Sequence, residues 1–121
     1  MSRSILIVDD EFGLAEMLAS LLEYRGFECV LAINGALGLS LLKQQTFSLV
    51  LTDVMMPRMD GIEMVRHMRA NPALAAVPVI VMTAMPSGIT TEERRLVQGV
   101  LAKPFGPDEL YAMIERVLEG N

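Results

Sequence analysis

Five short apolar runs alternate with five segments of helical periodicity along the chain, and this alternation constrains the fold more than any other feature. The apolar runs, which we expect to form strands, are residues 5–8, 28–32, 47–52, 77–83 and 100–102. The segments of helical spacing are residues 11–25, 36–44, 62–70, 90–98 and 107–118. Apolar strands that alternate with helices are typical of a parallel sheet covered on both faces, with right-handed crossovers. The sequence therefore predicts an α/β fold, a single doubly wound five-stranded parallel sheet flanked by five helices.

The composition indicates one ordered globular domain. The 121 residues are the length of a single domain, which we assign to residues 1–121, and 52% of them are apolar against 21% charged. The net charge of -5 argues against direct binding of nucleic acid through a basic face. No apolar run approaches the roughly 20 residues of a membrane span, so we expect no membrane insertion.

Cysteine usage and the start of the chain both favour a cytoplasmic location. The single cysteine, Cys29, excludes an internal disulfide framework and fits a reducing compartment. The apolar run at residues 5–8 is too short for the core of a signal peptide. One cysteine and one histidine also exclude a zinc site with the usual number of ligands.

Polar side chains with a chemical role follow four of the five expected strands. Asp9 and Asp10 come after the first strand, Asp53 after the third, Thr83 at the end of the fourth and Lys103 after the fifth. In a doubly wound sheet the binding site lies beyond the carboxyl ends of the strands, where the strand order reverses. We therefore expect three carboxylates, one hydroxyl and one ammonium group to share a small cleft.

This set of groups favours a metal-assisted phosphoryl transfer. Three neighbouring carboxylates repel one another and stay ionised only if a cation joins them. Oxygen ligands without His or Cys select Mg²⁺ or a similar divalent ion such as Mn²⁺. The metal and the Lys103 ammonium would neutralise phosphate charge while a carboxylate acts as nucleophile, and Thr83 and backbone N–H groups beyond Asp53 and at Ala84 would donate hydrogen bonds. The simpler alternative, that Lys103 only neutralises Asp53, leaves the acid pair and Thr83 unexplained.

Four motifs, in this order and at these strand ends, resemble those of a known family. They are Ile7-Val8-Asp9-Asp10-Glu11, the stretch from Asp53 to Gly61, Met82-Thr83-Ala84, and Lys103-Pro104-Phe105. The sequence resembles the receiver domain of two-component response regulators from about residue 4 to residue 118. The resemblance implies the flavodoxin-like (βα)5 fold of the chemotaxis regulators.

The resemblance also implies a role for each residue of the metal site. Asp53 would be the phosphoacceptor, which takes a phosphoryl group from a histidine kinase phosphohistidine. Asp10 and Asp53 would bind Mg²⁺ through their carboxylates and Met55 through its backbone carbonyl, whereas Asp9 would support the site through water.

Three further residues receive roles in the same way. Lys103 would pair with the phosphoryl group, and Thr83 would move toward it and report its presence. Pro104 would follow a cis peptide bond.

The implied function is a phosphorylation switch. Its partners would be a sensor histidine kinase or a histidine phosphotransfer domain on the input side, and an output protein or a fused output domain on the other. The protein would not be an enzyme beyond Mg²⁺-dependent phosphorylation of itself from a donor and its own dephosphorylation. We expect a monomer or a weak dimer. The chain ends at Asn121 without an output segment, and both a stand-alone receiver and one cut from a longer regulator or hybrid kinase stay open.

The sequence departs from the family where many receivers carry an aromatic residue three positions before the lysine, because this position is Val100. Valine presents no large group to relocate, and the turn before the fifth strand is reduced to Gln98 and Gly99. A receiver-like interaction module that works without phosphate is therefore an alternative. A small aspartate-based phosphohydrolase is a weaker one, because Met55 stands where such enzymes carry a second acid.

Three other features have simpler interpretations. We expect His67 to lie on the surface and Cys29 to fill buried space. Leu37 and Leu41 are four apart on one helix and are expected to point outward, either as ordinary surface residues or as a partner face with the methionines.

Overall fold

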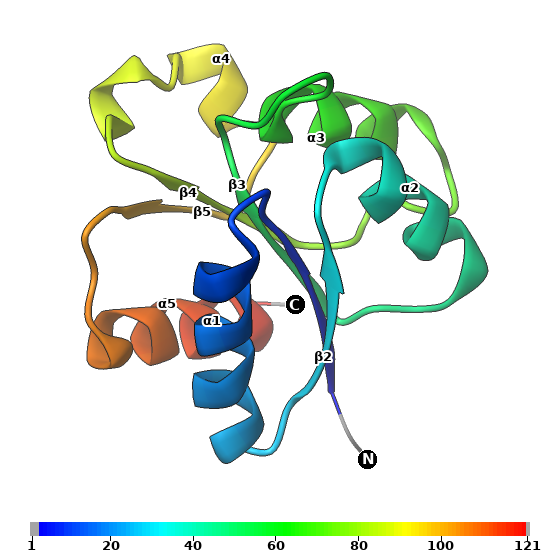
Figure 1. Cartoon of the computed structure of the whole chain (residues 1–121). Helices are drawn as coiled ribbons and strands as arrows, with labels where there is room; N and C mark the ends of the chain where they lie inside the picture. Colours follow the sequence, from blue (N-terminus) through cyan, green and yellow to red (C-terminus); the bar gives the residue numbers. More distant parts are fainter. Residues whose placement is uncertain (1–2, 121) are drawn as a thin grey trace.

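One parallel sheet lies between two layers of helices in the computed structural model, which describes residues 3–120 (Figure 1). Its strands are β1 (Ser4–Val8), β2 (Glu28–Ala32), β3 (Leu49–Asp53), β4 (Val79–Thr83) and β5 (Gly99–Ala102). They are all parallel, in the order β2-β1-β3-β4-β5. The strand order reverses between β1 and β3, which confirms the predicted doubly wound topology.

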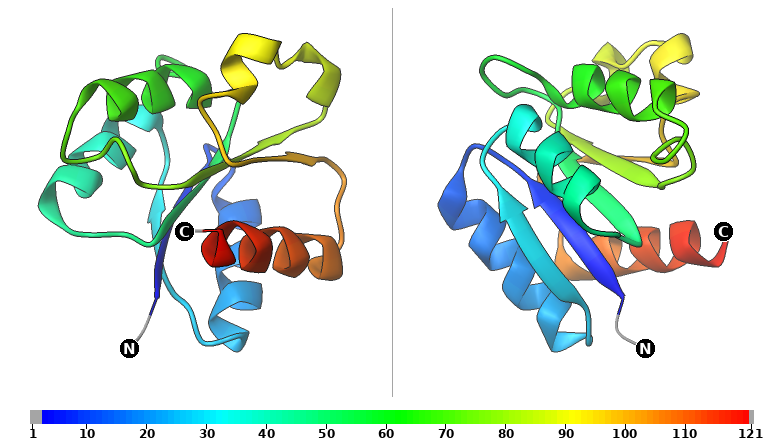
Figure 2. Two further views of the ribbon diagram at one scale, coloured as in Figure 1. Left: turned by 180° about the vertical axis from the view of Figure 1, so that it is seen from behind. Right: turned by 90° about the vertical axis from the view of Figure 1, so that its right-hand side faces the viewer.

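Five α-helices and one short 3-10 turn connect the strands. They are α1 (Phe12–Tyr24), α2 (Gly35–Gln44), α3 (Gly61–Ala70), the turn η1 (Pro86–Gly88), α4 (Thr91–Arg94) and α5 (Pro107–Glu119). Helices α1 and α5 cover one face of the sheet, and α2 and α3 cover the other (Figure 2). Among residues 3–120, no helix has the length and apolar character needed to cross a membrane.

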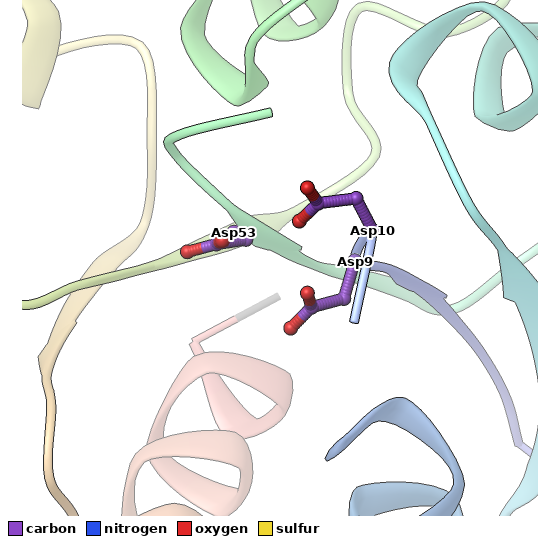
Figure 3. A group of neighbouring side chains, drawn as sticks. All are labelled: Asp9, Asp10 and Asp53. Carbon is purple, nitrogen blue, oxygen red and sulfur yellow. The ribbon is translucent and has the colours of Figure 1, made fainter. Parts of the chain in front are cut away.

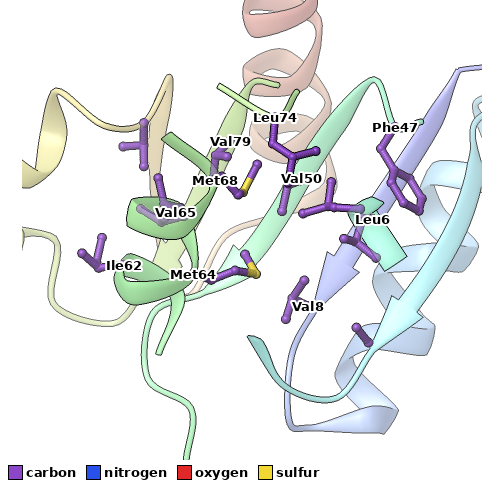
Figure 4. Packing of buried hydrophobic residues seen from close by; sticks show 14 of the residues in the cluster. Leu6, Val8, Phe47, Val50, Ile62, Met64, Val65, Met68, Leu74 and Val79 are labelled. Carbon is purple, nitrogen blue, oxygen red and sulfur yellow. The ribbon is translucent and has the colours of Figure 1, made fainter. Parts of the chain in front are cut away.

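The central strands supply both hydrophobic cores because successive side chains point to opposite faces of the sheet. Ile5 and Ile7 of β1 are buried with residues of α1 and α5. Leu6 and Val8 of the same strand are buried on the other side with residues of α3 such as Met64 (Figure 4). Burial on both faces explains why this strand reads as a continuous apolar run. The same burial holds β1 in a fixed position in the sheet. It therefore also fixes where the residues that follow β1 lie.

The helix predicted over residues 90–98 is wrong beyond Arg94, where α4 ends. The backbone N–H of Gln98 donates to the Val79 carbonyl at 2.8 Å. This bond already belongs to the approach of β5 toward β4, so the chain has to leave the helical path before it. The preceding turn η1 was not predicted, and β3 and β4 each begin two residues later than expected, at Leu49 and Val79.

The structure also places the residues with simpler interpretations. His67 is exposed on α3, as expected. Cys29 is half-buried rather than fully buried. Leu37 is exposed, but Leu41 packs partly against the core, so only one of the two points outward as predicted.

Candidate functional site

The register of the central strands brings the predicted polar residues to one edge of the sheet. Val8 pairs with Thr52, so Asp9 and Asp10 emerge beside Asp53, the last residue of β3. One carboxylate oxygen from each of these three residues lies within 4.8 Å of the others (Figure 3). The carboxylate cluster predicted from the strand ends therefore exists in the fold.

Asp53 is held in place from two sides. Its Oδ1 accepts a hydrogen bond from the Val54 backbone N–H at 3.1 Å, and the Lys103 ammonium Nζ lies 3.1 Å from the same oxygen. The side chain is 13% exposed, compared with 26% for Lys103. Asp53 is therefore fixed in orientation and still reachable from solvent, as a nucleophile needs to be.

Asp9 is the most deeply buried of the three acids, with only 1% of the residue exposed. Its Oδ1 accepts a hydrogen bond from the Glu11 backbone N–H at 2.9 Å, whereas its buried Oδ2 has no hydrogen-bond partner. Burial raises the pKa of the Asp9 carboxyl, and the charges of Asp53 and Asp10 raise it further, against the opposing effects of the Glu11 N–H and Lys103.

The residues present fit a hard divalent cation. An unpartnered buried carboxylate oxygen is costly, and Asp9 carries one beside two other acids. Lys103 is the one cation paired with this cluster among the described residues, so the three carboxylates keep an excess of negative charge. Carboxylate oxygens without nitrogen or sulfur ligands are the donor set that Mg²⁺ prefers.

Thr83 and Lys103 complete the cleft on the side of β4 and β5. Thr83 ends β4 with 6% of the residue exposed, and its Oγ1 accepts a hydrogen bond from the Met85 backbone N–H at 3.0 Å. Because this bond uses a lone pair, the hydroxyl hydrogen remains free to donate. The Lys103 backbone N–H donates to the Thr83 carbonyl at 2.8 Å. The peptide bond between Lys103 and Pro104 is cis, as predicted.

Gly61 belongs to the site, although the sequence identified it only as the last residue of the motif that begins at Asp53. A Cβ at this position would lie 2.3 Å from the Asp53 carbonyl oxygen. The Gly61 N–H also donates to the Val54 carbonyl at 2.9 Å. The first turn of α3 can therefore lie directly against the backbone of the Asp53 segment only because residue 61 has no side chain. The available signal was a glycine immediately after Asp60, the N-cap of α3.

Val100 is half-buried and packs against the core between the sheet and α3. At this position of β5 the chain offers no aromatic ring. Valine presents no large group to relocate, as the sequence indicates, and signalling without movement of an aromatic ring at this position stays a prediction.

Comparison with known proteins identifies relatives of this chain by sequence and by fold. The family model of the response regulator receiver domain matches residues 5–115. The phosphate regulon transcriptional regulatory protein PhoB of Pseudomonas aeruginosa is 34% identical over 98% of this chain, which corresponds to 52% of PhoB. The chain thus spans about half the length of the curated relatives it matches.

Solved structures agree with the sequence comparison. The chemotaxis protein CheY4 of Vibrio cholerae superimposes with a TM-score of 0.90 at 28% identity, covering 97% of this chain and 99% of that one. The response regulator TrrA of Thermotoga maritima, solved in complex with Mg(2+)-BeF, gives a TM-score of 0.87 at 27% identity, covering 95% of this chain and 98% of that one.

Proposed function

This chain belongs to the response regulator receiver domain family, and we propose that Asp53 is the residue on which it carries the phosphoryl group. Receiver domains of response regulators act as phosphoacceptors in two-component signalling. The observation that supports Asp53 is its position, because it is the accessible carboxylate that lies both 3.1 Å from the Lys103 ammonium and beside Asp9 and Asp10. We assign residues 1–121 to this single receiver domain.

In the reaction, a carboxylate oxygen of Asp53 attacks the phosphorus of a donor phosphohistidine. The new P–O bond forms as the P–N bond breaks, and the imidazole leaves with the electron pair and takes up a proton. Lys103 balances the negative charge that moves onto the phosphoryl oxygens. Thr83 donates its free hydroxyl hydrogen to one of these oxygens, and backbone N–H groups beyond Asp53 and at Ala84 would donate as well.

Asp9 and Asp10 would hold Mg²⁺, or Mn²⁺ in its place, together with Asp53 and the Met55 carbonyl. When bound, the metal supplies charge that offsets the phosphoryl oxygens and lets the three carboxylates remain ionised side by side. Support comes from the unpartnered oxygen of Asp9 and from TrrA, which was solved with Mg(2+)-BeF.

The same groups would reset the switch: a water attacks the phosphorus of the acyl phosphate, the bond between phosphorus and the Asp53 oxygen breaks, and inorganic phosphate leaves with the Asp53 carboxylate restored. Phosphorylation and this hydrolysis are the chain's own reactions in our proposal. The added charge would bias the segment that contains Thr83 and α4 between two arrangements, which a partner reads.

A sensor histidine kinase or a histidine phosphotransfer domain would supply the phosphoryl group in the cytoplasm. The reader would be an output protein or a fused output domain, because the matched relatives are about twice as long as this chain. We propose that the receiver itself is a monomer or a weak dimer.

Intact-mass spectrometry after incubation with Mg²⁺ and acetyl phosphate tests the proposal. We expect the mass of one added phosphoryl group on the wild type and none on Asp53→Asn. Asp108→Asn, an exposed acid of α5 outside the cleft, is the matched control and should be phosphorylated like the wild type. Addition of EDTA should abolish the adduct in both phosphorylatable proteins.

An adduct that persists on Asp53→Asn would overturn the assignment of the phosphoacceptor. Absence of both an adduct and a spectral response to beryllofluoride in the wild type would instead favour the phosphate-independent interaction module.

A further inference from the structure

The nine methionines of the described residues differ in exposure, with four buried, three exposed and two, Met59 and Met113, partly buried. The buried members among the described residues are Met56, Met64, Met68 and Met82. The exposed members are Met17 (53% exposed), Met55 (76%) and Met85 (69%). Large apolar side chains are stabilised by burial, so three exposed thioethers are a distinctive feature of this surface.

Two of these side chains belong directly to the segments that form the site. Met55 follows Asp53 by two residues, and Met85 follows Thr83 by two residues. Both line one hollow of about 330 Å³, and Thr83 lines the same hollow. Met17, by contrast, lines a separate cavity between α1 and the segment that follows β5.

We propose that Met55 and Met85 form a modification site, at which oxidation to methionine sulfoxide by hydrogen peroxide slows the phosphorylation of Asp53. This inference rests on the proposed function, because it concerns the regulation of the same site.

The modification needs only the thioether and the peroxide. A lone pair of the methionine sulfur attacks one peroxide oxygen, the O–O bond breaks, that oxygen becomes the sulfoxide oxygen, and the other leaves as water after proton transfer. The sulfur is oxidised and the peroxide is reduced. Both side chains are mostly in solvent, so peroxide reaches them and the product disrupts little packing. The buried Met64, Met68 and Met82 lack this access.

The lining of the hollow determines the consequence. Apart from the two methionines and Thr83, its walls are Val54, Ala84, Gly88 and Ile89. The Thr83 hydroxyl is therefore the only side-chain hydrogen-bond donor among the residues that line it. A sulfoxide oxygen is a strong acceptor and would compete for the hydroxyl hydrogen that Thr83 gives to the phosphoryl group.

We expect the phosphorylation rate to fall about threefold to tenfold, the factor that corresponds to one neutral hydrogen bond. The protein is treated with hydrogen peroxide, and peptide mapping by mass spectrometry follows the order in which the methionines gain oxygen. Met55 and Met85 should be converted well before Met64, Met68 and Met82. The rate of acetyl phosphate labelling at Asp53 is then measured before and after treatment.

Variants identify the source of the effect, each compared with its own untreated rate. The ratio of treated to untreated rates should return to one in the double variant Met55→Leu/Met85→Leu. It should also approach one in Thr83→Val, which has no hydroxyl hydrogen to lose. Met17→Leu is the matched control, because it removes an exposed methionine outside the hollow and should keep the full effect. Methionine sulfoxide reductases should restore the wild-type rate.

The outcomes separate the inference from the function on which it rests. If the untreated wild type accepts no phosphoryl group, the proposed function fails and this inference falls with it. If the untreated protein is phosphorylated and conversion of Met55 and Met85 leaves the rate unchanged, only the inference is overturned. A slowing that persists in the double leucine variant also overturns it.

Discussion

The carboxylate edge of the sheet and the connection from β4 to β5 are held in place by different interactions. The carboxylates emerge from β1 and β3, central strands whose apolar residues are buried on both faces. Residues 84–98 contain only a 3-10 turn and a four-residue helix, with Ile89 and Val97 as their buried apolar residues. The burial of whole strands thus positions the first region, whereas the second depends on a few specific polar contacts.

Arg69 of α3 makes two of those contacts, and two more to the segment that precedes β4. Its guanidinium donates hydrogen bonds to the carbonyl of Leu96 at 2.9 Å, to that of Val77 at 2.8 Å and to that of Ala75 at 3.1 Å, and to the Gln98 side-chain oxygen at 3.1 Å. The same Gln98 oxygen accepts from the Val79 N–H at 2.7 Å. Burial lowers the pKa of Arg69, but a guanidinium keeps its charge at any physiological pH. A single side chain therefore joins α3 to the end of the connection between β4 and β5 and to the segment that precedes β4.

Replacement of the Arg69 side chain should destabilise the connection from β4 to β5 and leave the carboxylate edge of the sheet unchanged. We expect Arg69→Met to lower the free energy of unfolding by about 3 to 5 kcal/mol, because several carbonyl groups lose a charged donor. Chemical denaturation measures the loss, and hydrogen exchange should show faster exchange at residues 96–99.

Arg66→Met is the matched control on the same helix. Arg66 lies 3.4 Å from Glu92 in an exposed pair, so its loss should cost less than about 0.5 kcal/mol. Equal costs for the two variants would show that Arg69 does not hold the connection.

The carboxylate edge of the sheet should be most sensitive to a change in the backbone contact between Gly61 and Asp53. We expect Gly61→Ala to lower the free energy of unfolding by about 2 to 3 kcal/mol, because the added methyl would meet the Asp53 carbonyl at 2.3 Å. The displacement should also slow labelling of Asp53 by acetyl phosphate, which separates this variant from one that is only less stable.

Gly13→Ala is the control for this substitution. Gly13 lies in α1 with nothing within 4 Å of an added Cβ, so alanine there should stabilise the helix by about 0.5 to 1 kcal/mol. A destabilised Gly13→Ala would mean that the method does not isolate the contact at Gly61.

The same difference explains what could be predicted from the sequence. Strand burial leaves a pattern in the local sequence, and the predictions of a doubly wound parallel sheet and of the carboxylate cluster followed from it. The contacts of Arg69 join residues that are far apart along the chain, and no local pattern reports them. The sequence predicted a helix over 90–98 from local spacing, and the tertiary bond from Gln98 to Val79 ends it early.

Removal of the buried Asp9 charge should change the free energy of unfolding by less than the two substitutions above. We expect Asp9→Asn to raise the free energy of unfolding at pH 7 without metal by about 1 kcal/mol, because a buried, unpartnered charge is removed. The folded-state pKa of Asp9 lies above its ordinary value of 3.8. The wild type therefore loses stability as the pH rises from that value through the raised pKa, and the penalty is complete above it.

Bound Mg²⁺ should reverse the order of stability of the wild type and Asp9→Asn. Millimolar Mg²⁺ should raise the melting temperature of the wild type more than that of Asp9→Asn, since a ligand that binds only the folded state stabilises it more as the ratio of its concentration to its dissociation constant rises. An Asp9→Asn variant that is less stable than the wild type at pH 7 without metal would contradict the assignment of strain to this carboxylate.

The smallest effect of Arg69→Met is expected at the opposite edge of the sheet, where the reactivity of Cys29 reports on β2. Burial, with a smaller contribution from the charge of Glu23, raises the pKa of the Cys29 thiol to about 11 from 9.0. The thiolate fraction near neutral pH is then about 100-fold lower than that of an unperturbed thiol, so alkylation by iodoacetamide should be slower by about this factor and should accelerate tenfold for each pH unit up to about 11. Arg69→Met should leave this rate unchanged while it accelerates hydrogen exchange at residues 96–99. If both rates rose together in that variant, the two edges would open as one cooperative unit, and the contrast between strand burial and side-chain contacts would not extend to their dynamics.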